Sequence, residues 1–65
     1  MKNINSRDLI KIIEKDGWYL VNVVGSHQQF KHKIKKGKVT IPHPKAELTT
    51  KTIKSILKQA EINGG

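Results

Sequence analysis

The sequence contains no cysteine, which excludes disulfide bonds, thiolate metal ligands and cysteine nucleophiles. Carboxylates are also scarce, because Asp and Glu together account for only 5 of the 65 residues. No apolar run approaches the roughly 20 residues that a membrane-spanning helix needs, and the first residues lack the apolar core of a signal peptide. We therefore expect a soluble protein of a reducing, cytoplasmic compartment.

The length of the chain sets the number of domains. A chain of 65 residues has room for one hydrophobic core and not for a second. We expect residues 1–65 to form a single domain, with residues 63–65 as a disordered tail. A domain of this size buries only about 60% of the surface that its unfolded chain exposes, so its stability depends on a well-packed core.

Positive charge is the most pronounced feature of the composition. Lys and Arg contribute 13 residues against 5 acidic ones, which gives a formal net charge of +8. Such an excess on a small fold favours a polyanionic partner: nucleic acid, an anionic membrane or an acidic protein. The alternative is a lysine-rich surface that serves only solubility.

Two segments have the apolar spacing of amphipathic helices. The first is residues 6–18, which Ser6 can cap and Gly17 can end. The second is residues 49–60, whose apolar side lies opposite a ridge of three lysines, namely Lys51, Lys54 and Lys58. Such a ridge can follow a phosphate backbone, although the same pattern is typical of an ordinary solvated helix face.

Three segments between these helices are rich in β-branched and aromatic residues and are predicted to be strands: residues 18–24, 27–34 and 38–41. Gly25 and Ser26 form the two-residue loop between the first two strands, because glycine at the first position supplies the positive φ required. The order is therefore helix, three antiparallel strands, helix. This is an α+β fold with two helices on one face of a three-stranded antiparallel sheet and the other face open.

The hairpin register predicts which side chains share a face. With Gly25-Ser26 as the loop, Val24 pairs with His27 and Val21 pairs with Phe30. The side chains expected in the core are Tyr19, Val21, Val23, Phe30, Val39 and Ile41. Those expected on the open face are Asn22, Val24, His27, Gln29, Lys31, Lys33, Lys38 and Thr40. Trp18 and Leu20 also fall on the open face in this register, an inconsistency that we attribute to a twist or bulge in the strand.

Several hydrolytic chemistries have little support in this sequence. The scattered carboxylates offer no cluster for a two-metal nuclease. His27 and His32 are predicted on opposite faces, and nothing brings His43 to them, so a three-histidine zinc site is disfavoured. Ser26 and His27 are adjacent strand residues that point apart, which argues against a serine hydrolase. We expect neither a metal nor a cofactor.

An exposed histidine can instead act on a substrate that carries its own nucleophile. RNA is such a substrate, because its 2′-hydroxyl lies next to the scissile phosphate and needs only a base and nearby cations. Histidine titrates close to neutral pH, which suits this role. On the residues alone, however, a histidine at a hairpin is more often inert than catalytic, so both interpretations of His27 remain open here.

Four short motifs follow one another at fixed spacing along the chain. They are Gly17-Trp18, Gly25-Ser26-His27-Gln28-Gln29-Phe30, Val39-Thr40-Ile41-Pro42-His43 and Ser55-Ile56-Leu57-Lys58-Gln59-Ala60. Together they resemble the HicA-type toxins of bacterial toxin–antitoxin systems, over about residues 5 to 62. The resemblance implies a double-stranded-RNA-binding-domain-like fold of α-β-β-β-α order, ribosome-independent mRNA cleavage, and neutralisation by a HicB-type antitoxin.

The resemblance also assigns roles to individual residues. It implies that His27 is the catalytic histidine. Gln28 stands where many members have a second histidine, and Asn22 where many have an arginine, which removes one cation from the open face. Gln29 and Lys31 are expected to contact RNA because they lie beside His27 on the predicted strand. The resemblance implies that Gly25, Ser26, Lys51 and Lys54 contact RNA as well.

The leading hypothesis is a metal-independent endoribonuclease, an mRNA interferase of the bacterial cytoplasm that is monomeric alone and hetero-oligomeric with its antitoxin. The alternatives are a non-catalytic double-stranded-RNA-binding module and a small DNA-binding or regulatory protein. Because the chain carries a net charge of +8, we expect the antitoxin to present acidic groups over His27 and to bind less tightly as salt rises. Salt-independent binding would instead indicate an apolar interface centred on Val24, Leu20 or Trp18.

Overall fold

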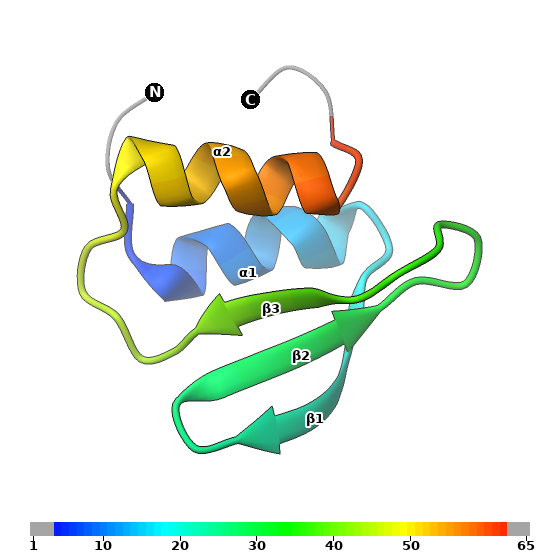
Figure 1. Ribbon diagram of the computed structural model, residues 1–65, viewed down its shortest axis with the longest axis horizontal. Coiled ribbons are helices and arrows are strands. Elements are labelled where there is room, and N and C mark those ends of the chain that lie inside the picture. The colour runs from blue at the N-terminus through cyan, green and yellow to red at the C-terminus, as the bar shows by residue number, and fades with distance from the viewer. Residues whose placement is uncertain (1–3, 63–65) are drawn as a thin grey trace.

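The computed structural model describes residues 4–62, so the tail expected at residues 63–65 lies outside the described part. The elements are α1 (Ser6–Lys15), β1 (Tyr19–Val24), β2 (His27–Lys31), β3 (Val39–Pro42) and α2 (Thr50–Gln59). The strands form one antiparallel sheet of order β1-β2-β3 (Figure 1). The predicted α+β fold with its α-β-β-β-α order is confirmed.

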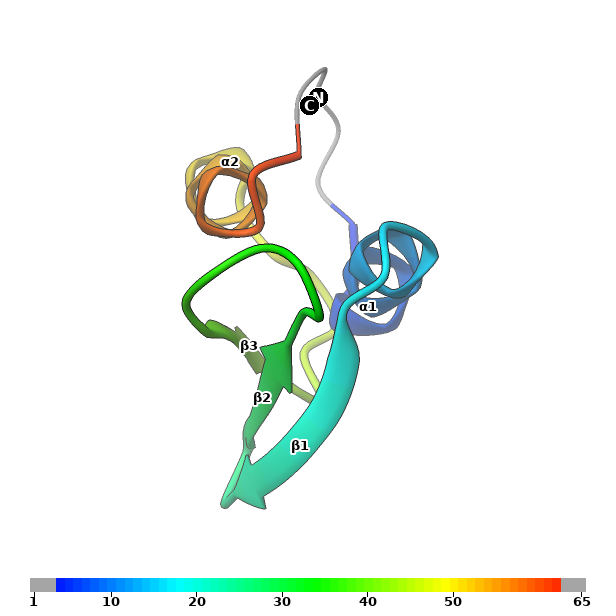
Figure 2. The same cartoon turned by 90° about the vertical axis from the view of Figure 1, so that its right-hand side faces the viewer.

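The two helices lie side by side on one face of the sheet, and both contact β3 (Figure 2). Between the helices and the sheet lies a core to which every element except β1 contributes a buried side chain. This core consists of Leu9, Ile13, Trp18, Phe30, Val39, Ile41, Leu48, Ile53, Ile56, Leu57 and Ala60. The apolar side predicted for the second helix is therefore buried as expected.

The start of α1 differs from the prediction. Asn5, not Ser6, caps the helix, and its side chain accepts a hydrogen bond from the backbone N–H of Asp8 at 2.8 Å. Ser6 is buried instead, with 1% of its surface exposed. The end of α1 is as predicted, because Gly17 follows it with a φ of 111°, and a Cβ there would lie only 2.7 Å from Nε2 of His32.

A β-bulge in β1 changes the register away from the turn. The register shifts between Leu20 and Asn22, so Leu20 and not Val21 lies opposite Phe30. The shift moves every earlier residue to the other face of the strand, and it brings Trp18 into the core with 2% of its surface exposed. The bulge that we inferred from the conflict at Trp18 and Leu20 is therefore present.

The core prediction was right for two strands and wrong for the third. Phe30, Val39 and Ile41 are fully buried. Tyr19, Val21 and Val23 were wrongly assigned to the core, because 46%, 44% and 54% of their respective surfaces are exposed. The helices pack over the β3 side of the sheet, while β1 curves away from them at the opposite edge (Figure 2). As a result, all six residues of β1 are exposed.

Candidate nucleic-acid interface

His27 is the first residue of β2 and directly follows a two-residue turn. Val24 and His27 pair across this turn. Gly25 has a φ of 58°, the positive value that a turn with glycine first requires. A Cβ on Gly25 would meet no atom within 4 Å, so the backbone conformation alone favours glycine here. The turn therefore presents the exposed side chain of His27 at one end of the sheet.

Polar side chains of β2 continue along the open face from His27. Gln29 and Lys31 alternate with Phe30, and because Phe30 is fully buried against the helices, His27, Gln29 and Lys31 project from the opposite face. Lys38 reaches the same face, where its Nζ donates to Oε1 of Gln29 at 3.5 Å. The predicted residues of β2 therefore share one face, and their contact with RNA stays a prediction.

An open groove with a volume of about 410 Å³ lies between β3 and α2. Its lining residues are Lys38, Thr40, Pro42, Lys51, Thr52, Ser55, Ile56 and Gln59. Pro42 pairs with His27 in the sheet, so the groove borders the strand pair that carries the histidine. Of the two lysines predicted on the second helix, Lys51 lines this groove, whereas Lys54 is exposed outside it.

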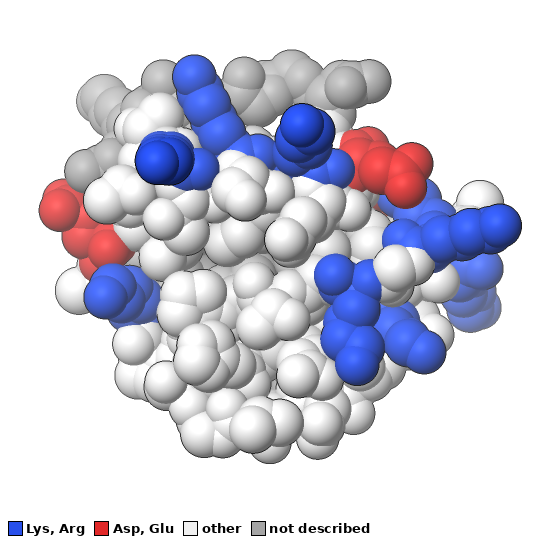
Figure 3. Space-filling view, in the orientation of Figure 1, with Lys and Arg blue, Asp and Glu red and all other residues white. Residues whose placement is uncertain are grey.

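Lysine and arginine side chains form two groups on the face shown in Figure 3, and a further cation lies apart from them at the left edge. One group lies over α2 and the other over the loop between β2 and β3. Over the β1–β2 hairpin, the described residues on this face show no charged side chain. Lysines therefore flank the groove, whereas the described residues of the hairpin carry no charge on this face.

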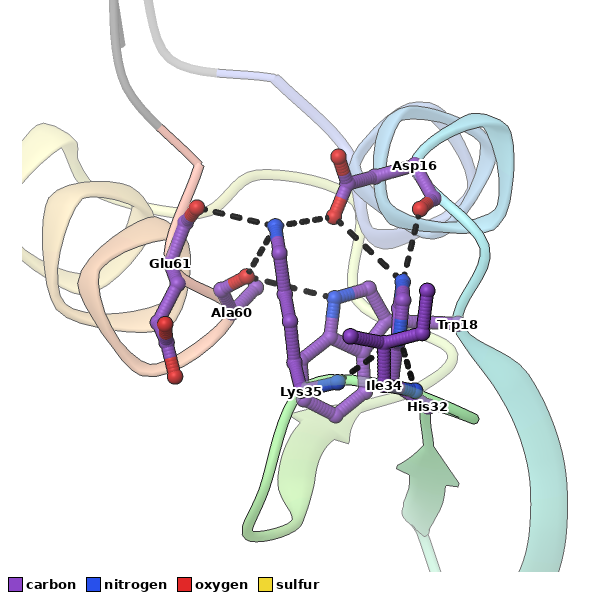
Figure 4. A network of polar contacts seen from close by, with 7 residues as sticks. All are labelled: Asp16, Trp18, His32, Ile34, Lys35, Ala60 and Glu61. Atoms are coloured by element: carbon purple, nitrogen blue, oxygen red, sulfur yellow. Dashed lines mark hydrogen bonds and ion pairs between the residues drawn. The ribbon is translucent and has the colours of Figure 1, made fainter.

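Lys35, one of the loop lysines, is committed to the fold. Its Nζ donates to Oδ2 of Asp16 at 2.5 Å and to the carbonyl oxygens of Ala60 and Glu61 at 3.1 and 2.9 Å (Figure 4). Asp16 ends α1 and Ala60 ends α2, so one ammonium group joins the C-terminal ends of both helices. From the sequence alone, Lys35 was indistinguishable from the lysines around it.

The contact with Lys35 also affects the ionisation of Asp16. The hydrogen bond from the ammonium group holds the pKa of Asp16 below its usual value of 3.8. A lowered pKa in the folded state stabilises the protein above pH 3.8, and this stabilisation is lost as the pH falls through the folded-state pKa.

We therefore expect Asp16→Asn to lower the free energy of unfolding at pH 7 and to become equivalent to wild type in strong acid. Urea unfolding of both proteins between pH 7 and pH 2 measures the difference. Glu14→Gln on the exposed side of α1 is the matched control, because Glu14 makes no ion pair with any described residue. A difference between Asp16→Asn and wild type that stays constant down to pH 2 would contradict this account.

His32 belongs to the same network and is not part of the open face. Its Nε2 donates to the carbonyl oxygen of Asp16 at 2.9 Å, and its Nδ1 accepts from the backbone N–H groups of Ile34 and Lys35 at 3.0 and 3.1 Å. These bonds fix the tautomer with the proton on Nε2. They also turn the backbone away from the neighbouring strands of the sheet, so β2 ends at Lys31 and not at the predicted residue 34.

His43 anchors the turn from the other side. Its backbone N–H donates to the carbonyl oxygen of Ser26 at 2.7 Å. The Ser6 hydroxyl accepts from the backbone N–H of Lys45 at 2.9 Å and also forms a hydrogen bond with Nδ1 of His43, 2.6 Å away. The ring of His43 thus faces α1, whereas His27 lies on the open face. No local pattern in the sequence predicts this link, which connects α1 to the turn that presents His27.

Between residues 4 and 62, no group of three or more His, Cys, Asp or Glu residues is placed to hold a metal ion. In the same part of the chain, no helix has the length and apolar character to cross a membrane.

The fold and the surface define a small basic α+β domain with a lysine-flanked groove next to an exposed histidine. The family model described as "HicA toxin of bacterial toxin-antitoxin" matches residues 6–62. Because this match covers nearly the whole chain, the protein belongs to the HicA toxin family, and membership implies an antitoxin partner. A comparison with curated proteins gives no match.

Proposed function

We propose that this toxin is a metal-independent endoribonuclease that cleaves mRNA in the bacterial cytoplasm, with His27 as its catalytic residue. The observation that carries the proposal is the position of His27 in a member of the HicA toxin family. The side chain is exposed at a tight turn, and Pro42 opposite it lines a groove flanked by lysines. An RNA strand in that groove would bring its phosphates close to both the histidine and the cations.

The proposed reaction uses the nucleophile that RNA itself provides. The imidazole of His27 takes the proton of the 2′-hydroxyl, and the 2′-oxygen attacks the adjacent phosphorus. The bond from phosphorus to the 5′-oxygen breaks, and the leaving oxygen takes a proton from the imidazolium or from water. The products are a 2′,3′-cyclic phosphate and a free 5′-hydroxyl. Lys31, on the same face, helps to stabilise the negative charge that develops on the phosphate oxygens.

A comparison of RNA with DNA in excess chelator tests this function. We expect the toxin to cut a single-stranded RNA and to leave the DNA of the same sequence intact, because DNA lacks the 2′-hydroxyl. Loss of RNA cleavage on addition of chelator would overturn the metal-independent mechanism. Cleavage of the DNA at a comparable rate would overturn the use of the 2′-hydroxyl.

A non-catalytic double-stranded-RNA-binding module is the second candidate, and one observation favours it. No described side chain forms a hydrogen bond with His27, so no orienting group is in contact with the imidazole. This candidate predicts RNA that is bound but never cut, and no growth defect when the protein is produced in cells. The same chelator experiment distinguishes the two functions.

Lys51 is expected to hold a phosphate in the groove. Lys51→Ala should weaken RNA binding about equally for all sequences and reduce the slope of log affinity against log salt by about 1. Lys11→Ala is the matched control, because Lys11 is exposed on α1 and does not line the groove. Fluorescence anisotropy at several salt concentrations gives both slopes, and equal slopes for the two variants would remove Lys51 from the interface.

We also propose that the antitoxin is of the HicB type and presents acidic groups to this chain. The net charge of +8 makes copies of the toxin repel one another, which favours a monomer when the antitoxin is absent. With the antitoxin it forms a hetero-oligomer. The charge further implies that association becomes faster as salt is lowered.

A further inference from the structure

The outer strand of the sheet is a large apolar surface without a partner in the described part of the chain. All six residues of β1 are exposed. Five of them are apolar, with between 44% and 54% of their surface accessible: Tyr19, Leu20, Val21, Val23 and Val24. We call this surface the β1 edge. A small soluble domain rarely exposes a continuous apolar strand unless something binds to it.

The backbone of the β1 edge is also open to pairing. Within residues 4–62, β1 has a single neighbour, β2, so its outer side has no strand beside it. Val24 and His27 flank the two-residue turn and form the hydrogen-bonded pair, which makes the next pair, Val23 with Gln28, the non-hydrogen-bonded kind. The N–H and C=O groups of Val23 therefore point outwards, towards the position of an added strand.

Proteins usually protect such an edge with lysine, proline or an inward-pointing charge. β1 contains no proline and no charged residue, although lysine is the commonest residue of the chain. Its one irregularity, the bulge at Val21, leaves the segment from Asn22 to Val24 in regular pairing. The edge is thus suited to β-augmentation, in which a partner adds an extended segment to the sheet.

We propose that the β1 edge is the docking site for an extended apolar segment of the antitoxin, which adds a fourth strand to this sheet. A second copy of the chain fits less well, because pairing two edges would bring two domains of charge +8 together. An acidic antitoxin would have the complementary charge, and family membership implies that an antitoxin partner exists. The proposal rests on the proposed antitoxin and is independent of RNA cleavage.

This docking mode offers a physical route to neutralisation. Val24 lies directly opposite His27, so a strand added outside β1 would lie two strand spacings, about 10 Å, from the histidine. At the other end of β1, Tyr19 pairs with Lys31, whose ammonium group can meet a carboxylate of the partner. The added strand would therefore place other parts of the antitoxin next to the histidine end of the sheet.

A backbone substitution tests the proposal. Val23→Pro removes the outward N–H and keeps an apolar side chain, whereas Val23→Thr keeps the N–H and the β-branched shape. We expect Val23→Pro to weaken binding of the purified HicB-type antitoxin at least about tenfold, and Val23→Thr to stay within about threefold of wild type. Calorimetry gives the affinities, and circular dichroism checks that each variant is folded. Equal affinities for folded Val23→Pro and Val23→Thr would overturn the proposal.

A second pair of variants covers the case in which Val23→Pro does not fold. Val21→Lys adds one charge to the β1 edge and should weaken antitoxin binding, whereas Ala46→Lys adds the same charge to an exposed loop and should not.

Hydrogen exchange of the wild-type complex should show protection of the Val23 amide. Unprotected β1 amides in the complex, or a β1-paired dimer of the toxin without antitoxin, would overturn the proposal. None of these measurements detects RNA cleavage, so a failure of this proposal is distinguishable from a failure of the nuclease function.

Discussion

His27→Ala is expected to reduce the rate of RNA cleavage by at least about 100-fold, the lower end of what a general acid or base contributes. The side chain is exposed and makes no hydrogen bond with a described residue, so its removal should leave the fold unchanged. RNA affinity should change little, because the lysines of the groove and not His27 hold the phosphates. Single-turnover cleavage of end-labelled RNA measures the cleavage rate, and fluorescence anisotropy measures the RNA affinity.

Two controls separate the chemistry of the imidazole from its size. His27→Gln keeps a polar side chain of similar length and cannot take up a proton near neutral pH, so we expect it to be as inactive as the alanine variant. Gln28→Ala changes the next residue along β2, and it should retain nearly full activity. Cleavage by His27→Ala within about threefold of wild type would remove His27 from the reaction.

Trp18→Ala is expected to remove a large part of the free energy of unfolding. Trp18 is 2% exposed, its Nε1 donates to the carbonyl oxygen of Ala60 at 3.3 Å, and its ring meets the ring of His32 edge-on at 5.3 Å. Truncation of a buried tryptophan costs about 3–5 kcal/mol. A domain of this length has a total stability of about 3–10 kcal/mol, so the loss is about a third of that stability or more.

Tyr19→Ala is the control for that experiment, and it also tests the bulge. Without the bulge, Tyr19 would lie in the core and Trp18 on the open face, whereas here Tyr19 is 46% exposed. We expect Tyr19→Ala to lower the unfolding free energy by about 1 kcal/mol or less, as for other surface changes. Circular dichroism in urea measures both variants. If Tyr19→Ala were as destabilising as Trp18→Ala, the register described here would be wrong.

The features that the sequence predicted correctly depend on residues close together in the chain. The turn at Gly25-Ser26 and the exposure of His27 follow from glycine at the first turn position and from alternation along β2. The burial of one side of the second helix follows from its periodicity. These are local rules, and tertiary packing did not override them.

The errors concern features set by packing between distant segments. Alternation predicted that one face of β1 would be buried, but burial depends on where the helices sit, and they cover the opposite edge of the sheet. In the same way, a list of lysines cannot show that Lys35 joins two helix ends while Lys38 and Lys51 line one groove. The hydrogen bond between Ser6 and His43 joins residues 37 positions apart, and no local pattern indicates it.

The most direct test of the central claim uses an RNA in which one nucleotide is 2′-deoxy. After the cleaved position has been mapped on an unmodified RNA in excess chelator, the same RNA is made with only the 2′-hydroxyl at that position removed. We predict that cleavage at this position is lost, that other sites are still cut, and that the unmodified products carry 2′,3′-cyclic phosphates. Undiminished cleavage next to the 2′-deoxynucleotide would contradict the mechanism.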